Sequence, residues 1–470
     1  MKVKSKKLIN NTFLFLLGNL GSKFIQFILV PLYTYTLTTE EYGQTEIVLT
    51  TINFLIPIFS LSISDAFLRF GLDKKYKQNE VTKVALITIF IGGIASIAFI
   101  PIYNINSTIS NWIQYFLLIL NLRMYRDIFS IRLKVLENNK LYAIDNILYT
   151  FVLCISNIIF LVMMKMQING YFLSYVVANI FSILFIIIMS KFSYKELKGK
   201  TNKKVFKEMI VYSLPMIVNG ISWWVTNASD RFMIAWLMTD SDVGIYSVSA
   251  KIPTLITTFS GIFSQAWIIS SVLEFQNEKE KNFYSNTFKN YYGLLFLACS
   301  ILIPVIKPFM KLYVSHSYFE AWVYTPVLIS SAIYSGIASF AVGIYTACKK
   351  NISITITTLI GGIANIILNY ILIPKIGILG AAIATLISWF IIAVVRIIDM
   401  KRFFEFNIDY KLLLFYTILN VLQILIIYHF DNYLGVAMSI IITCIFIFYE
   451  RKLILDCYKI GINKVKGILK

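Results

Sequence analysis

Three basic side chains inside long apolar stretches are the residues of this sequence best suited to binding a charged group. Lys23, Arg231 and Lys251 each lie within a stretch long enough to cross a membrane. A bare cation at mid-membrane costs of order 2.5–3.5 kcal/mol on insertion scales, so such residues usually face a cavity or a partner. Two interpretations stay open: these cations line a cationic cavity, or they form structural ion pairs, such as Lys23 with Asp65.

Acidic residues beside these cations are candidates for charge pairing or for ion coupling. Asp230 directly precedes Arg231, and neighbouring residues of a helix do not face each other. If Arg231 is a structural residue, its partner is therefore expected to be an acid on another helix. Asp65 and Asp127 are the other candidates of this kind.

A stripe of polar residues runs along one stretch, which has an amphipathic pattern. Arg123, Asp127, Ser130 and Lys134 are spaced so that they fall on one face of a helix. This face is suited to a vestibule for a headgroup on the cytoplasmic side, and the alternative is that the long side chains simply reach the interface. Arg69, near the inner end of the second apolar stretch, allows the same two interpretations.

Motifs of enzymes and metal proteins are missing or weak. The sequence has no phosphate-binding loop of the Gly-x-x-x-x-Gly-Lys-Ser/Thr type, and its five cysteines include no CxxC pair. The two histidines, His316 and His429, are far apart and support neither a metal site nor a catalytic dyad. Asp240 and Asp242 form an Asp-x-Asp pattern, which we interpret as part of a turn. We expect no cofactor, no metal and no enzymatic activity.

The composition explains which elements position these residues. The chain has 470 residues, of which 58% are hydrophobic and 14% charged, and its mean hydropathy is +0.73. Soluble domains are about a quarter charged, so most of this chain must lie in lipid, with no room for a large soluble domain. About twenty apolar residues span a membrane as a helix. The sequence predicts an all-α, polytopic membrane protein with fourteen spans at 10–36, 44–68, 84–103, 111–131, 143–164, 169–190, 209–237, 244–272, 288–309, 321–347, 352–373, 377–398, 410–428 and 433–450.

The net charge of +19 is distributed unevenly along the chain. With the N-terminus placed in the cytoplasm, 36 of the 43 Lys and Arg residues fall in cytoplasmic segments and four in outer ones. The cytoplasmic cations lie before residue 10 and in segments 69–83, 123–140, 191–207, 279–289, 349–350, 396–411 and 451–470. This bias is typical of membrane proteins, so nucleic-acid binding is not needed to explain the charge. Both termini are predicted to be cytoplasmic.

A repeat relates the two halves of the chain. A shift of 201 residues aligns the turn at 37–43 with that at 238–244, and both are acidic, polar and closed by Gly. A shift of 207 aligns residues 168–173 with 375–380. Six helices per copy give a parallel repeat. We predict an N-terminal six-helix bundle at 1–190, a basic linker at 191–207, a second bundle at 208–398, and two extra helices with a basic tail at 399–470.

Several short motifs resemble those of the oligosaccharide-lipid flippases (Wzx type) of the multidrug/oligosaccharidyl-lipid/polysaccharide exporter superfamily. The motifs, spread over nearly the whole chain, are Glu-Glu-Tyr-Gly at 40–43, Ala-Phe-Leu-Arg-Phe at 66–70, Tyr-Ser-Leu-Pro at 212–215, Ser-Asp-Arg at 229–231, Val-Gly-Ile-Tyr-Ser at 243–247, Ile-Pro at 373–374 and Gly-Ile-Leu-Gly-Ala-Ala at 377–382.

The resemblance implies a flippase in the bacterial cytoplasmic (inner) membrane, with a lipid-linked oligosaccharide of the undecaprenyl pyrophosphate type as cargo. It would serve O-antigen, capsule or exopolysaccharide assembly, with membrane lipids and a polysaccharide polymerase as partners. A pyrophosphate would be attracted to a cavity lined by Lys23, Arg69, Arg123, Arg231 and Lys251. The alternatives are a cation/drug antiporter of the same superfamily and a membrane polysaccharide polymerase or glycosyltransferase.

Overall fold

The computed structural model describes residues 21, 23–193, 197–198, 202–274, 281–404, 406–430 and 432–455. Within these ranges the regular structure is helical throughout, and no strand occurs. In lipid every backbone N–H and C=O group needs a partner inside its own segment, which a helix provides. The expected all-α membrane fold is confirmed. Residues 10–20 and 22 of the expected span 10–36, and residues 194–196 and 199–201 of the linker, lie outside the described residues.

The chain forms two compact units, Met1–Ser247 and Val248–Lys470. After helical residues 23–36, the first unit contains α2 (Thr39–Phe59), α3 (Ile63–Gly71), α4 (Gln78–Ala98), α5 (Ile100–Tyr103), α6 (Ser107–Asn111), α7 (Ile113–Val135), α8 (Asn139–Asn157), the π-helical η1 (Ile158–Met163), α9 (Gln167–Met189) and α10 (Lys203–Leu237), and it ends within α11 (Asp240–Ser249). The second unit contains α12 (Lys251–Glu274), α13 (Lys281–Tyr313), the 3-10 helix η3 (His316–Tyr318), α14 (Ala321–Ala347), α15 (Asn351–Ile376), α16 (Ile378–Met400), α17 (Tyr410–His429) and α18 (Tyr433–Tyr449).

Nine helices of the described chain are long and apolar enough to cross a membrane, or ten if the bent pair α2 and α3 is one span. Two further helices, α7 and α10, have 23 and 35 residues but more polar sequences. At 1.5 Å per residue they measure about 35 and 50 Å, against a hydrocarbon core of about 30 Å. The protein therefore crosses the membrane many times, while the number fourteen stays a prediction.

A bend separates α2 from α3 and sets the direction of the segment that carries Asp65 and Arg69. The two helices differ in direction by 55°. Between them Leu61 and Ser62 have φ values of 50° and 47°, which are left-handed and break the helical hydrogen-bond ladder. A Cβ on Gly92 of α4 would overlap the carbonyl oxygen of Phe59, so α4 touches the backbone of α2 just before the bend.

The first unit includes α10, which packs along α2 and α3. Tyr76, in the loop after α3, donates a 2.9 Å hydrogen bond to Glu208 of α10 and links the two sides of this packing. By contacts the chain divides after Ser247, whereas the domain boundaries expected around 191–207 stay a prediction.

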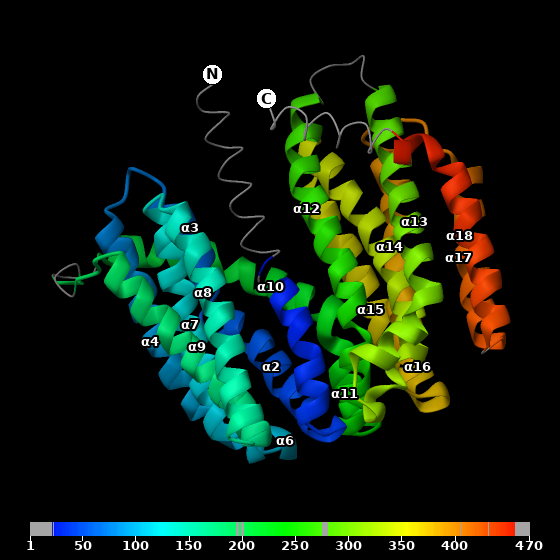
Figure 1. Cartoon of the computed structure of the whole chain (residues 1–470). Coiled ribbons are helices and arrows are strands. Elements are labelled where there is room, and N and C mark those ends of the chain that lie inside the picture. Colours follow the sequence, from blue (N-terminus) through cyan, green and yellow to red (C-terminus); the bar gives the residue numbers. More distant parts are fainter. Residues whose placement is uncertain are drawn as a thin grey trace, which may run out of the picture. The chain divides into compact units, whose positions relative to one another are not determined.

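In the second unit, α14 is the central helix (Figure 1), surrounded by α12, α13, α15 and α16. The last two helices attach to α13 through buried polar groups. Gln423 of α17 donates hydrogen bonds to the carbonyl oxygens of Ser300 in α13 and Ser439 in α18, at 2.9 and 3.2 Å. Thr443 of α18 donates to the same Ser300 carbonyl at 2.8 Å. Such interhelical bonds help to hold helices together where both sides are apolar.

The two turns aligned by the 201-residue shift have matching structures. Thr38 caps α2 by accepting from the Glu41 N–H at 3.2 Å, and the Thr38 N–H donates to the Glu41 carboxylate at 2.9 Å. Thr239 and Asp242 exchange the same two bonds at the start of α11, at 3.2 and 3.1 Å. These are two capping boxes, with Glu in one and Asp in the other. Glu41 and Asp242 therefore have the same local role in the two turns.

Equivalent residues of these turns also touch each other. A Cβ on Gly43 would overlap the carbonyl oxygen of Asp240, and a Cβ on Gly244 would overlap that of Thr39. The 201-residue shift carries Gly43 onto Gly244 and Thr39 onto Asp240, so the two contacts are reciprocal. The Ser241 hydroxyl also donates to that of Thr39 at 2.7 Å. Only glycine allows the backbones of α2 and α11 to approach so closely here.

Candidate functional site

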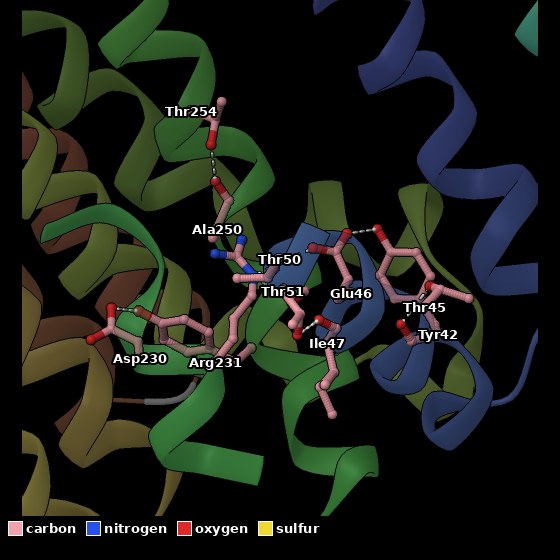
Figure 2. A network of polar contacts seen from close by, with 12 residues as sticks. Tyr42, Thr45, Glu46, Ile47, Thr50, Thr51, Asp230, Arg231, Ala250 and Thr254 are labelled. Atoms are coloured by element: carbon pink, nitrogen blue, oxygen red, sulfur yellow. Dashed lines mark hydrogen bonds and ion pairs between the residues drawn. The ribbon is translucent and has the colours of Figure 1, made fainter. Parts of the chain in front are cut away.

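A buried ion pair joins α2 to α10 in the first unit (Figure 2). Arg231 Nε lies 3.3 Å from Glu46 Oε2, and the two side chains are 17% and 11% exposed. The same Arg231 Nε also donates to Ser247 Oγ of α11 at 3.0 Å. The acid on a neighbouring helix that would make Arg231 a structural residue is therefore present, and it is Glu46.

Tyrosine hydroxyl groups bind the two acids of this region, Glu46 and Asp230. Tyr42 donates its hydroxyl proton to Glu46 Oε1 at 3.0 Å, and its ring stacks on that of Tyr33 with centroids 5.9 Å apart. On the other side, Tyr246 donates to Asp230 Oδ2 at 2.6 Å, so Asp230 and Arg231 point to different partners (Figure 2). Removing one member of a buried ion pair is strongly destabilising because it leaves a buried charge without its partner. This network fixes the positions of α2, α10 and α11.

A second buried network links α7, α8 and α9. Arg126 Nη2 lies 3.1 Å from Asp145 Oδ2, its Nε donates to Ser182 at 2.8 Å, and its guanidinium lies 3.9 Å from the ring centroid of Tyr149. Ser182 donates to Asp145 Oδ1 at 2.6 Å, and the Asp145 side chain is fully buried. Arg126 and Asp145 lie within the predicted spans 111–131 and 143–164, but the sequence gives no sign that they meet. Arg126 therefore faces a partner between helices.

The expected polar stripe lies on α7. Arg123 and Asp127 are half-buried and lie one helical turn apart on α7. Lys134, near the end of α7, places its ammonium group 4.3 Å from the ring centroid of Tyr142. The helix thus places Arg123 and Asp127 on the same face, as their spacing predicts.

The candidates on α3 are more exposed. Asp65 is exposed. Arg69 lies 3.6 Å from Asp73, one turn later, with 61% of its side chain exposed. An exposed pair of this kind contributes little to stability, so Arg69 retains freedom to contact a ligand.

The two lysines lie in different units. Lys23 is exposed in the helical residues 23–36, and Lys251 is half-buried at the start of α12. Their approach to one ligand is a question of how the units are arranged during transport, and it stays a prediction.

The Asp-x-Asp pattern serves to cap a helix and to anchor its turn. Asp242 accepts hydrogen bonds from the Thr239 backbone and hydroxyl, and Asp240 Oδ2 accepts from Thr108 at 2.8 Å. Across the described ranges, no group of three or more His, Cys, Asp or Glu residues is arranged to hold a metal.

Arg396 is more deeply buried than the other cations of segment 396–411. It stands at the end of the predicted span 377–398, and in the structure it lies inside α16 and is 5% exposed; the side of the membrane on which this segment lies stays a prediction. Its position one turn before the helix end gave no sign that it points inward.

Comparisons with known proteins give the family. The family described as "Polysaccharide biosynthesis protein" matches residues 8–269. The chain is 24% identical over 225 residues to the "Capsular polysaccharide biosynthesis protein CapF" of Staphylococcus aureus, an alignment that covers 46% of this chain and 55% of that protein. It is 25% identical over 263 residues to "Lsg locus putative protein 1" of Haemophilus influenzae, covering 53% and 62%. These alignments span between about half and three fifths of the curated relatives.

Solved structures give the fold. The chain is similar to the lipid II flippase MurJ in an inward closed conformation, with a TM-score of 0.70, 17% identity, and coverage of 95% of this chain and 100% of that one. An inward-facing multidrug resistance MATE family transporter of the MOP superfamily gives a TM-score of 0.69 at 13% identity, covering 82% and 93%. At these identities the likeness establishes the fold alone. Because the family match extends over more than half of the chain, this membrane protein belongs to the polysaccharide biosynthesis protein family, and its fold is similar to those of MurJ and the MATE transporter.

Proposed function

We propose that this protein is a flippase that moves a polyprenyl-pyrophosphate-linked oligosaccharide across the bacterial cytoplasmic membrane by alternating access, for surface polysaccharide biosynthesis. Both termini would lie in the cytoplasm, and a polysaccharide polymerase would use the product on the other side. The protein would supply binding and conformational change and no bond-making chemistry.

One observation carries this proposal: a family of polysaccharide biosynthesis proteins is matched in a chain whose fold follows a lipid II flippase over 95% of its length. The drug-transporter fold covers less, 82% of the chain. Transport of a lipid-linked saccharide is the activity that agrees both with the family and with the structural match of higher coverage, the lipid II flippase.

The basic residues that are candidates for binding the pyrophosphate have different surroundings in the structure. Lys23, Arg69 and Arg123 are exposed or half-buried, as a residue that must reach a ligand has to be. Arg231 is bound to Glu46, which favours a structural role in joining α2 to α10. We therefore assign ligand binding to Lys23, Arg69, Arg123 and Lys251, and positioning of the helices to Arg231.

The acidic candidates divide in the same way. Asp127 follows Arg123 by one turn of α7, and the exposed Asp65 precedes Arg69 by one turn of α3. Protonation or cation binding at either carboxylate would change the charge next to a ligand-binding cation, which is what ion coupling requires. Asp230 is only 5% exposed and accepts from Tyr246, which supports a charge-pair or structural role.

The test is a flipping assay on the purified full chain in proteoliposomes. A fluorescent polyprenyl-pyrophosphate glycolipid is placed in both leaflets, and a membrane-impermeant reagent quenches the outer one. Flipping makes the label in the inner leaflet accessible as well, so quenching should approach completion with the protein present. Quenching that stops at about the outer-leaflet share, as in protein-free vesicles, would refute the proposal.

A drug antiporter is the second candidate because MATE transporters share the fold. The same vesicles distinguish it: a proton or sodium gradient would then drive uptake of a fluorescent organic cation, while the glycolipid would remain in its leaflet. A polymerase or glycosyltransferase would instead change the mass of the glycolipid, which chromatography of the extracted lipid detects.

A further inference from the structure

A groove of about 370 Å³ lies between the beginning of α15 and the end of α16 in the second unit. Its walls include Ser353, Ile356, Thr357 and Ile360 from α15, and Ile398 and Arg402 from the end of α16 and the turn that follows. The two helices are antiparallel neighbours joined at Gly377, so α15 begins where α16 ends. The groove therefore opens near one interface of the membrane.

An unneutralised cation lies directly behind the groove. Arg396 donates from Nε to the Thr357 hydroxyl at 2.9 Å, from Nη2 to that of Thr358 at 2.8 Å, and from Nη1 to the Ala338 carbonyl at 2.9 Å. All of these acceptors are neutral, and Arg396 forms no ion pair with a carboxylate of the described chain. Buried charges are normally paired. Here the Arg396 guanidinium has hydrogen-bond acceptors but no carboxylate partner in the described chain. Thr357, which accepts one of its hydrogen bonds, lines the groove, so the positive charge lies close to the groove.

A second cation stands at the mouth of the groove. The Arg402 side chain is 73% exposed and lies 3.7 Å from Asp399, which also lines the groove. An exposed pair at this distance is weak, so Arg402 can turn toward a ligand while Asp399 offsets only one charge. Lys350 and Lys401 lie at the same ends of α15 and α16. Together with Arg396, these residues give the site a net positive charge.

The rest of the groove is apolar and open to the surroundings of the helices. Ile356, Ile360 and Ile398 are 51%, 41% and 58% exposed. Ile356 and Ile360 follow each other by one helical turn, so they form an apolar strip that runs from the cationic mouth along α15. A cationic mouth at the interface followed by an apolar strip complements a phosphate group joined to an acyl chain.

We propose that this groove binds one anionic phospholipid of the surrounding membrane. Its phosphate would accept hydrogen bonds from Arg402 and from the Ser353 hydroxyl, and one acyl chain would lie along Ile356 and Ile360. A phosphatidylglycerol-type headgroup, which has one net negative charge, offsets the charge left by Arg396. A phosphatidylcholine of the same chain length fits the strip but adds no net charge.

The test is a lipid titration of the delipidated full chain in detergent, followed by native mass spectrometry. The probes are phosphatidylglycerol and phosphatidylcholine with identical acyl chains. We expect a tighter site for phosphatidylglycerol than for phosphatidylcholine. Arg402→Gln should weaken phosphatidylglycerol binding roughly fivefold, the effect of one interfacial cation. Ser353→Phe, which fills the groove, should abolish that site even if Arg402→Gln fails to fold.

A matched control removes an interfacial arginine elsewhere. Arg451, exposed after α18, lines no part of the groove, so Arg451→Gln should bind phosphatidylglycerol as the parent does. Equal affinity for the two lipids would overturn the proposal, as would equal losses in Arg402→Gln and Arg451→Gln. Inorganic phosphate is the last probe. Displacement of the lipid by millimolar phosphate would overturn the acyl-chain contact and leave only an anion site.

Discussion

Gly43→Ala should separate the starts of α2 and α11. The added Cβ would lie 2.6 Å from the carbonyl carbon of Asp240 and 3.0 Å from the backbone nitrogen of Gly244, and it would overlap the Asp240 oxygen. Ordinary contact begins at 3.4 Å, so the carbonyl carbon alone requires the backbones to move apart by about 0.8 Å, and the nearer oxygen requires more. The atoms in the way are backbone, which cannot rotate aside.

The cost follows from this overlap. Forcing an extra carbon into a packed contact costs typically about 1–3 kcal/mol. That shifts the equilibrium between the close and the separated arrangement by roughly 5- to 150-fold. Because the contact is reciprocal, Gly244→Ala should have an effect of the same sign through Thr39.

Cysteine cross-linking measures the separation. Thr39 and Ser241 bring their hydroxyl oxygens to 2.7 Å, so cysteines at these two positions are within reach of a disulfide. In a background without native cysteines, oxidation should cross-link this pair rapidly, and Gly43→Ala should slow it at least several-fold. Gly261 of α12 has nothing within 4 Å of an added Cβ, so Gly261→Ala is the matched control. Unchanged cross-linking in Gly43→Ala would refute the steric argument.

Three further predictions test the site and the topology. Glu46→Gln breaks the buried pair with Arg231, at a cost of up to about 3–5 kcal/mol, so we expect a lower thermal unfolding temperature in detergent; an unchanged one would contradict a structural role for the pair. Lys23→Ala or Lys251→Ala removes a charge-assisted contact of order 1.5–3 kcal/mol, and should reduce glycan export at normal expression and insertion, with partial activity in the Lys→Arg variants; alanine variants that export normally would show that the lysines are structural. Reporter fusions after Lys200 and at the C-terminus should both report the cytoplasm, and an outer location of either would disprove the topology.

In the interior of the first unit, the position of a residue on its own helix is predictable from the sequence, whereas its partner on another helix is not. The charge and spacing of Arg123 and Asp127 predict a common helix face, and α7 places them there, because a helical period is a local property. The partner of Arg231 could be predicted only as an acid on another helix. Its identity as Glu46 depends on how α2 and α10 are rotated against each other.

The rotation of one helix against another cannot be predicted from this sequence, for a physical reason. In a helix of a water-soluble protein, apolar residues mark the buried face and polar residues the exposed one. In lipid both faces of a helix are apolar, so the sequence does not show which face is buried. Pairs such as Arg126 with Asp145, 19 positions apart, therefore leave no periodic signal. The same holds for Arg396, which is one turn from a helix end and whose inward direction is set by Thr357 and Ala338 on two other helices.

The sequence by itself determined that the chain is helical and crosses a membrane many times, because runs of apolar residues in lipid have no other way to satisfy their backbone. It also determined that the turns at 37–43 and 238–244 are equivalent, since their Thr, acid and Gly stand at fixed spacing. Only the tertiary structure decided that these turns touch through Gly43 and Gly244. It also decided which cations have an acidic partner, as Arg231 does, and that Arg396 lies without one behind a groove. Those facts depend on contacts between helices distant in sequence, which packing determines and local pattern does not.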